Sequence, residues 1–204
     1  MPQRMPATFP DGWNRNTHYH ERLLQSVPRD CQRALDVGCG RGTFARRLSQ
    51  MSGHVDAIDS DAAVIRAARD CSVRARNVMF IEADFMMWKA DAPYDFVSMV
   101  AVLHHLPFGD ALIKAADLLR PGGALVVLGL DREPSLLHLA ARCLIAVPMT
   151  GYYRIVRRVS PVGAPTLDPT MTLSEIRRDA SRLLPGAIVR RHALLRYSLM
   201  WTKR

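Results

Sequence analysis

From residue 33 onward, short apolar or β-branched runs alternate with stretches of helical periodicity, and this alternation constrains the fold of the 204-residue chain more than any other feature. A strand, a helix and a second strand form the repeating unit of a parallel sheet that carries helices on its faces. The sequence therefore predicts an α/β domain. The strands are expected at residues 33–37, 55–59, 78–82, 94–100 and 124–130.

Helices are predicted between these runs by apolar periodicity and by capping residues. Phe44, Ala45 and Leu48 repeat at the spacing of one helix face. Asp61 and Thr172 precede helical segments and are good N-caps, and Thr172 forms a Thr-x-x-Glu capping sequence with Glu175. The predicted helices are 18–26, 43–50, a segment opening near Asp61, 110–120 (stopped by Pro-Gly-Gly) and 173–184.

The chain changes character after residue 130. Residues 131–170 are rich in proline and combine an apolar helical face with a group of arginines, so we interpret them as an insertion that forms a lid or a dimer surface. Two strand-like runs, 187–194 and 198–203, are so close in sequence that they must pair antiparallel at the edge of the sheet. We expect one domain over 1–204, divided into an N-terminal cap segment (1–30), a core (31–130), the insertion (131–170) and a last helix with a strand pair (171–204). The members of the insertion's apolar face are Leu136, Leu137, Leu139, Ala140, Cys143, Leu144 and Val147, and its arginines are Arg154, Arg157 and Arg158.

The composition is that of a globular protein, with 49% apolar and 23% charged residues. Four scattered cysteines without a C-x-x-C pair predict neither disulfides nor a zinc site, and with no export signal they favour the cytoplasm. Residues 131–204 carry 13 basic and 5 acidic side chains, which supplies +8 of the formal net charge of +9. Such a surface attracts anions or anionic lipid, although nucleic acid and peripheral membrane contact are both disfavoured.

A glycine-rich turn, Leu-Asp-Val-Gly-Cys-Gly-Arg-Gly at 35–42, joins the first predicted strand to the first helix of the core. Glycines at alternate positions let a ligand approach the backbone closely, beside the free N–H groups of a helix start. A dinucleotide fingerprint needs glycine where Thr43 stands, which disfavours a nicotinamide-dependent reductase. No Gly-Lys-Ser/Thr follows, so the turn is not a Walker loop.

Acidic residues follow the next two predicted strands. Asp59 lies 21 residues after Gly38, where a carboxylate can accept hydrogen bonds from both ribose hydroxyls. Asp84, followed by Phe85, lies where a carboxylate can accept from an adenine amino group while an aromatic ring lines the base. These strand ends together predict a site for an adenosine that carries an amino-acid tail.

With these residues, the chain resembles the class I S-adenosylmethionine-dependent methyltransferases, in particular their small-molecule branch. The resemblance is carried by ALDVGCGRG, VDAIDSD, IEADF, YDFVSMVAVLHHL and LLRPGGALVV, in the family's order and spacing. It implies a doubly wound, Rossmann-like sheet of seven strands in the order 3-2-1-4-5-7-6, with strand 7 antiparallel. It also implies S-adenosylmethionine as cofactor, S-adenosylhomocysteine as product, and no metal.

The resemblance assigns the glycine turn to the methionine part of the cofactor, Asp59 to the ribose, and Asp84 with Phe85 to the adenine. Val100 and Ala101, at the end of the fourth strand, would face the transferable methyl group. The cofactor-binding positions that we expect are Tyr19, Asp36, Gly38, Cys39, Gly40, Gly42, Asp59, Ser60, Asp84, Phe85, Val100 and Ala101.

Histidines are the candidate bases. His104 and His105 follow the fourth strand on the rim of the expected site, where an imidazole could take a proton from a hydroxyl acceptor. The alternative is that they only pack the loop. In the N-terminal segment, Tyr19 could donate to the methionine carboxylate and His18 or His20 could act as base, or these side chains could simply face solvent.

The predicted function is methyl transfer to a small-molecule acceptor, and an apolar lid favours a hydrophobic one. The alternative is a non-catalytic S-adenosylmethionine-binding sensor or partner subunit.

Residues 91–94, Asp-Ala-Pro-Tyr, approach the signature of enzymes that methylate amino groups of bases, but they precede the fourth strand instead of following it. We therefore interpret them as a turn. The sequence does not decide between a monomer and a homodimer.

Overall fold

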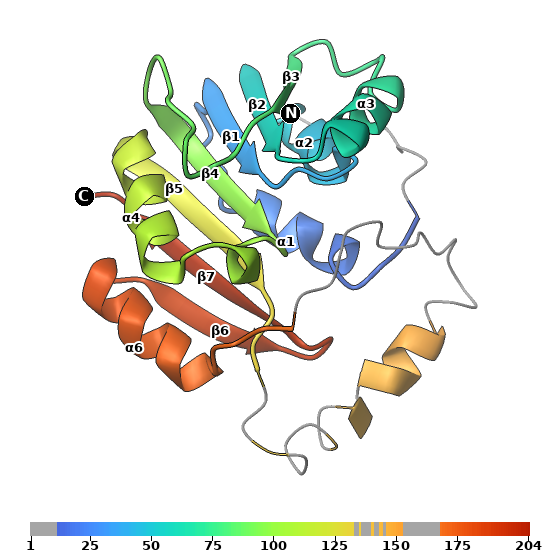
Figure 1. The fold of residues 1–204 in the computed structure, drawn as a ribbon, viewed down its shortest axis with the longest axis vertical. Helices are drawn as coiled ribbons and strands as arrows, with labels where there is room; N and C mark the ends of the chain where they lie inside the picture. The colour runs from blue at the N-terminus through green and yellow to red at the C-terminus, as the bar shows by residue number, and fades with distance from the viewer. Residues whose placement is uncertain (1–11, 133–134, 136–139, 141–142, 145, 153–167) are drawn as a thin grey trace.

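The structure is a computed structural model that describes residues 12–132, 135, 140, 143–144, 146–152 and 168–204. A seven-stranded sheet in the order β3-β2-β1-β4-β5-β7-β6 forms its centre (Figure 1). Strands β1 to β5 run parallel, while β7 pairs antiparallel with both β5 and β6. The predicted order and the antiparallel seventh strand are thus confirmed. The strands are β1 (Arg33–Val37), β2 (His54–Asp59), β3 (Val78–Glu82), β4 (Tyr94–Val100), β5 (Leu119–Gly129), β6 (Ile188–His192) and β7 (Arg196–Thr202).

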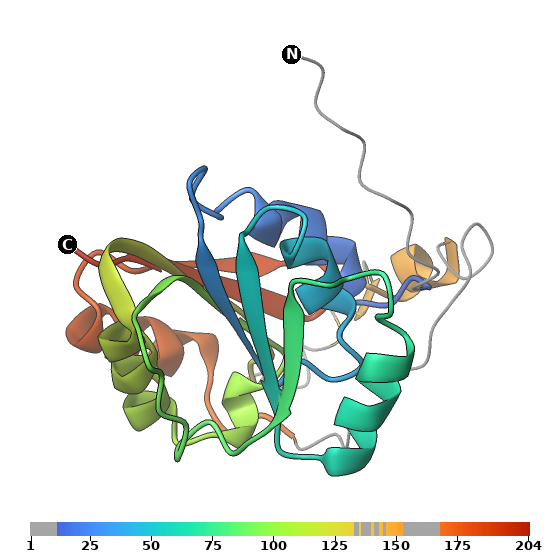
Figure 2. The ribbon, with the colours of Figure 1, turned by 90° about the horizontal axis from the view of Figure 1, so that it is seen from above.

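Helices cover both faces of the sheet (Figure 2). Successive side chains of a strand point to opposite faces, so Ala34 belongs to the core beneath α1, α2 and α3, whereas Leu35 belongs to the core beneath α4 and α6. The predicted inward stripe of α2, Phe44, Ala45 and Leu48, is buried as expected. The helices are η1 (Thr17–Tyr19), α1 (His20–Leu24), α2 (Thr43–Leu48), α3 (Ala62–Asp70), η2 (Leu103–His105), α4 (Phe108–Leu118) and α6 (Leu173–Leu183).

Both predicted N-caps are confirmed. The Asp61 carboxylate accepts hydrogen bonds from the backbone N–H groups of Ala63 and Val64 at the start of α3. Thr172 and Glu175 form a reciprocal capping box at the start of α6. These local signals position α3 and α6 because they satisfy N–H groups that have no partner within the helix.

The Pro-Gly-Gly sequence does not separate helix from strand, contrary to prediction. Strand β5 already begins at Leu119, and so runs through it. The Gly122 N–H donates to the Lys203 carbonyl at 2.8 Å, and the Lys203 N–H donates to the Gly123 carbonyl at 2.9 Å. Gly122 has φ +80°, which glycine adopts without strain. The left-handed glycine therefore makes an irregularity within the strand, and its backbone groups stay paired.

The C-terminal hairpin also turns earlier than predicted. Its turn is 193–195, so Leu194 lies in the turn and not in a strand. Leu194 is fully buried, and its N–H donates to the Tyr19 hydroxyl at 3.1 Å. Leu195 takes a left-handed φ of 57°. The turn is set by its packing against the N-terminal segment, which strand periodicity does not reveal.

Most of the expected insertion, including Arg154, Arg157 and Arg158, lies outside the described residues. In the part that is described, residues 146–152 are helical. The exposed fractions of Leu144, Val147 and Tyr152 there are 78%, 60% and 61%. A search of the described residues finds no helix with the length and apolarity needed to cross a membrane.

Candidate functional site

The glycine loop between β1 and α2 depends on all three of its glycines. Gly38, Gly40 and Gly42 have φ values of 63°, 54° and 74°. A Cβ at Gly38 would lie 2.4 Å from the Val102 side chain, and one at Gly42 would lie 2.5 Å from the Phe80 ring. A Cβ at Gly40 would meet no atom within 4 Å. The loop is therefore tightly packed against the protein at Gly38 and Gly42, and Gly40 leaves space for a ligand.

Hydrogen bonds hold this loop to the end of β2. The Cys39 N–H donates to the Ile58 carbonyl at 2.9 Å. The Gly40 N–H donates to Asp59 Oδ2 at 2.9 Å, and the Asp61 N–H donates to Asp59 Oδ1 at 3.1 Å. Cys39 is buried, and burial raises the pKa of its thiol. The Asp59 carboxylate thus holds the glycine loop in place through hydrogen bonds, apart from any ligand that it could bind. The neighbouring Ser60 is exposed.

Asp36, the second-last residue of β1 before the glycine loop, is a buried acid. One of its two carboxylate oxygens has no hydrogen-bond partner among the described residues. Its side chain accepts a hydrogen bond from Ser98 Oγ at 2.8 Å through Oδ1, whereas buried Oδ2 has no hydrogen-bond partner among the described residues. Burial, with a smaller contribution from the charge of Asp59, raises the pKa of Asp36 to about 7. A buried acceptor of this kind favours a donor, above all a cationic one.

Asp84 and Phe85, which follow β3, lie in different surroundings. Asp84 is exposed and accepts from the Met86 N–H at 2.7 Å. Phe85 is 4% exposed and packs in the core under α4, with Lys114 Nζ 5.7 Å from its ring centroid. Of the two predicted adenine contacts, the carboxylate lies at the surface and the ring lies inside.

The end of β4 carries an unusual backbone conformation. Ala101 has φ 58°, and its N–H donates to the Leu128 carbonyl at 2.7 Å. A left-handed alanine is strained, and such strain concentrates at functional sites. Val100, just before it, is half-buried and packs against the core. The chain then turns directly into η2, which brings the two histidines next to the strand end.

His104 and His105 differ in their surroundings. Their ring centroids are 4.0 Å apart. His104 is half-buried, and its Nδ1 has no hydrogen-bond partner among the described residues. Burial, together with the nearby His105 and Arg196, lowers the pKa of His104 to about 4, so His104 is neutral at physiological pH. His105 is exposed.

The N-terminal segment packs on the same end of the sheet. Tyr19 is 7% exposed, its hydroxyl accepts from the Leu194 N–H, and its ring lies 4.9 Å from that of His192. His20 is buried against Phe44, and burial with the nearby charge of Arg47 lowers the pKa of His20 to about 3. His20 is thus enclosed and uncharged, which does not suit the accessible base that the sequence suggests.

Two buried arginines near the site are absent from the sequence prediction. Arg196, at the start of β7, is 7% exposed, and its Nε donates to Asn16 Oδ1 at 2.9 Å. Arg46, on α2, is 2% exposed. Arginine is rarely fully buried unless it is paired, and no pattern in the sequence distinguished these two from the exposed arginines.

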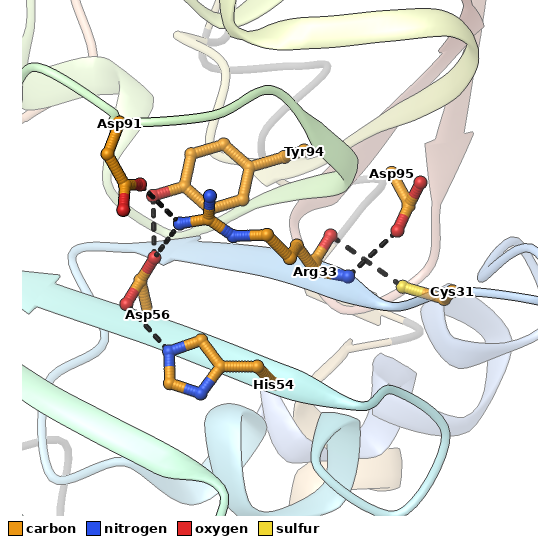
Figure 3. Close-up of polar contacts among 7 residues, drawn as sticks. All are labelled: Cys31, Arg33, His54, Asp56, Asp91, Tyr94 and Asp95. Atoms are coloured by element: carbon orange, nitrogen blue, oxygen red, sulfur yellow. Dashed lines mark hydrogen bonds and ion pairs between the residues drawn. The ribbon is translucent and has the colours of Figure 1, made fainter.

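A separate polar network occupies the opposite, amino-terminal edge of the sheet (Figure 3). Asp56 accepts from the Tyr94 hydroxyl at 2.7 Å and from Arg33 Nη2 at 3.2 Å, and it lies 3.0 Å from His54. Arg33 also pairs with Asp91 at 2.7 Å. The 91–94 turn therefore belongs to this network and lies at the other edge of the sheet from the glycine loop.

Among the residues that the structure describes, no cluster of three or more His, Cys, Asp or Glu side chains is arranged to hold a metal ion. The elements that carry the predicted cofactor contacts, by contrast, lie together at one edge of the sheet. The glycine loop, the ends of β2, β3 and β4, and η2 all lie at the carboxyl edge of the parallel strands, where α/β sheets bind their ligands.

Sequence comparisons match this arrangement. Residues 34–123 fit the family model of a methyltransferase domain. An uncharacterized methyltransferase of Mycobacterium tuberculosis is 35% identical over 196 residues, covering 93% of this chain and 96% of the relative. A ubiquinone biosynthesis O-methyltransferase of Xylella fastidiosa is 33% identical over 126 residues, which covers 58% of this chain and 50% of the relative.

Structural comparisons agree on the fold. DhpI, solved as a complex with S-adenosylhomocysteine, is 22% identical with a TM-score of 0.64, over 90% of this chain and 81% of DhpI. The N-methyltransferase NodS of Bradyrhizobium japonicum, also solved with S-adenosylhomocysteine, is 16% identical with a TM-score of 0.63, over 93% and 88% of the two chains. With a relative matched along almost its whole length and the predicted strand order in place, the chain belongs to the class I S-adenosylmethionine-dependent methyltransferase family.

Proposed function

We propose that this chain binds S-adenosylmethionine at the glycine loop and transfers its methyl group to the hydroxyl of a small molecule with an apolar part. The observation that carries the proposal is the unused, buried Oδ2 of Asp36 beside a glycine loop that is open at Gly40. An amino acid that carries an ammonium group is a ligand that this pair of features suits.

The residues present fit such a cofactor part by part. Asp36 would accept from the ammonium group, while Gly38, Cys39, Gly40 and Gly42 approach the methionine chain with backbone only. Asp59, with Ser60 beside it, would accept from the ribose hydroxyls. Exposed Asp84 would accept from the adenine amino group, and the backbone at Phe85 would border the base, because its ring is buried in the core. Tyr19 would donate to the methionine carboxylate, since its hydroxyl already accepts one bond and keeps its proton to give.

Catalysis in this site is mainly a matter of alignment. S-adenosylmethionine supplies an electrophilic methyl group on a positively charged sulfur. The protein holds the acceptor oxygen in line with that bond and keeps water out. The strained turn at Ala101 and the side chain of Val100, at the end of the central strand β4, would border the methyl group.

The proposed base is His105. A general base works best when its pKa lies near the working pH. The pKa of about 4 makes His104 a weak base, although it is neutral. His105 is the exposed member of the pair, and the ring of His104 packs against it with centroids 4.0 Å apart. His105 would take the hydroxyl proton as the oxygen attacks the methyl group.

The apolar character of the acceptor is supported by two observations. Leu144, Val147 and Tyr152 expose apolar side chains in the insertion, which follows β5 at the site edge. A partial relative is named for O-methylation in ubiquinone biosynthesis, and its substrate class is consistent with a hydroxyl on an apolar molecule. We propose that the acceptor binds between the N-terminal segment and this insertion.

The test is calorimetric titration with S-adenosylmethionine and S-adenosylhomocysteine, followed by label transfer from methyl-labelled cofactor into cell extract. Micromolar binding and label in a small apolar molecule would support the proposal. Binding without any transfer, over extracts from several growth conditions, would favour a non-catalytic sensor. The absence of binding to either compound would overturn the cofactor assignment.

A further inference from the structure

Arg46 lies in the middle of α2, directly after the glycine loop, and its side chain is 2% exposed. A buried guanidinium is costly unless hydrogen bonds satisfy it. Nothing in the proposed function uses Arg46, although it is among the largest fully enclosed side chains of the described structure. Its partners indicate why the chain tolerates this burial.

The guanidinium joins three segments. Nη1 donates to the Arg41 carbonyl at 2.7 Å and to Ser72 Oγ at 3.0 Å, and Nη2 donates to Thr43 Oγ1 at 3.3 Å. Arg41 belongs to the glycine loop, Thr43 begins α2, and Ser72 lies in the turn after α3. One side chain thus anchors the loop to two helices.

The contact with Arg41 complements the contact made by Asp59. Asp59 holds the N–H of Gly40 at 2.9 Å, and Arg46 holds the carbonyl of the next residue. Nη1 also lies beneath Gly42, where a Cβ would be 3.2 Å away. A loop with three glycines has many backbone conformations available when nothing restrains it. These two charged side chains, which bind backbone groups of successive loop residues, restrain the loop to one of these conformations.

We propose that Arg46 is a positioning residue for the cofactor: it holds the glycine loop in the conformation that receives the methionine part of S-adenosylmethionine. The proposal rests on the proposed function, because it assumes which ligand the loop binds. Arg46 does not contact the cofactor. It acts through the Arg41 carbonyl, and so affects the part of the ligand that lies on the loop.

Adenosine separates this role from a general structural one. S-adenosylhomocysteine carries the methionine-derived chain, whereas adenosine carries only the base and ribose, which the ends of β2 and β3 would bind. Loss of a loop restraint weakens the first ligand selectively. Loss of overall stability weakens both ligands together or changes only the melting temperature.

The experiment compares wild type, Arg46→Met, Arg46→Lys and Ser72→Ala, with Arg66→Met on the exposed face of α3 as matched control. Kd values are measured by calorimetry for S-adenosylhomocysteine and for adenosine, and melting temperatures are recorded for each protein. We expect Arg46→Met to weaken S-adenosylhomocysteine about tenfold or more and adenosine by less than about twofold. We expect Arg46→Lys to lose about three- to fivefold, because lysine keeps the charge but not the planar donor set. Ser72→Ala, which leaves the Arg41 contact intact, and Arg66→Met should bind as wild type does.

Equal weakening of both ligands, or an unchanged affinity for S-adenosylhomocysteine, would overturn the proposal. If Arg46→Met does not fold, the ratio of the two Kd changes in Arg46→Lys decides in the same way. Wild-type protein that binds neither ligand would overturn the proposed function, and this proposal with it. Wild-type binding combined with a non-selective Arg46 effect would overturn this proposal alone.

Discussion

The two halves of the carboxyl edge of the sheet are built from opposite chemistry. Over β1, β2 and β3 the side chains are the acids Asp36, Asp59 and Asp84. Next to the ends of β4 and β6 and the start of β7 they are mostly imidazoles and a guanidinium, contributed by His104, His105, His192 and Arg196. An acid on this side, Asp131, follows β5 and pairs with Arg191. The acidic half suits a ligand rich in donors and positive charge. The basic half offers donors and neutral bases, as proton removal from an acceptor requires.

The halves also differ in how the chain assembles them. Each acid of the first half follows or ends a strand of the parallel sheet, so its position comes from local structure. The second half joins segments about 175 residues apart: Asn16 pairs with Arg196, and Tyr19 pairs with Leu194. Burial, with the neighbouring charges of Arg22, Arg190 and His18, lowers the pKa of His192 in this half. Under the proposed function, a cofactor side that forms locally and an acceptor side that forms through long-range contacts would let the acceptor change while the cofactor stays the same.

Replacing the proposed base should have the largest effect. We expect His105→Ala to lower kcat for a hydroxyl acceptor by about 10²- to 10⁴-fold, the usual contribution of a general base, with the affinity for S-adenosylhomocysteine unchanged. His104→Ala should lower kcat far less. Both are measured by label transfer to the acceptor that the extract screen identifies. Equal kcat for His105→Ala and wild type would remove the catalytic difference between the two halves.

Asp36→Asn should show how much the negative charge of Asp36, in the acidic half, lowers the free energy of unfolding when no ligand is bound. The pKa of Asp36 rises from 3.8 to about 7 on folding, so the folded protein binds more protons between these values. Stability from the protonated carboxyl is therefore complete below about pH 4 and is lost as pH rises through 7. The asparagine stays neutral, and we expect it to raise the free energy of unfolding by roughly 2 to 4 kcal/mol at pH 8 and hardly at all at pH 4.

Urea unfolding of the ligand-free protein at the two pH values measures this difference. Asp110→Asn, an exposed acid on α4, is the matched control and should show little pH-dependent change. An Asp36→Asn effect that is equal at pH 4 and pH 8 would contradict the assigned ionisation.

Asp59→Ala should weaken the affinity for S-adenosylmethionine by about 1 to 3 kcal/mol, because it removes a charged acceptor from the ribose hydroxyls. The structure adds a second cause, since the Gly40 N–H also loses its acceptor. Calorimetry measures the change. Asp91→Ala, an exposed acid at the opposite edge of the sheet, should bind as wild type does. Unchanged binding by Asp59→Ala would sink the assignment of this half to the cofactor.

Tyr19→Phe should have the smallest effect and links the two halves. It leaves the buried Leu194 N–H without its acceptor, which we expect to cost about 1 kcal/mol in the free energy of unfolding. If Tyr19 also donates to the methionine carboxylate, affinity for S-adenosylhomocysteine falls a few-fold in the same variant. A lower free energy of unfolding with an unchanged affinity for S-adenosylhomocysteine would assign Tyr19 to the basic half alone.

The sheet order is predicted through the family resemblance that the motifs carry, and the acidic half is predicted from the acids at the strand ends. Asp59 and Asp84 are visible as acids that come directly after apolar runs. The sequence does not reveal that the Phe85 ring turns inward, because an aromatic residue after a strand suits a base or a core equally well. Nor does it place Arg46 under the loop. The contact depends on the bend of the folded loop that brings the Arg41 carbonyl to Arg46 Nη1, which no spacing along the chain encodes.

The pairing of Tyr19 with Leu194 also sets an order of events during synthesis. Tyr19 leaves the ribosome before the hairpin that anchors it, which is made more than 170 residues later. Long-range contacts of this kind form late in folding, since much of the chain must be ordered before they close. The nascent domain can therefore complete its acidic half before the contacts of its basic half have formed. Under the proposed function, the glycine loop and the acids of the cofactor site would form before the hairpin fixes Tyr19 and the acceptor side.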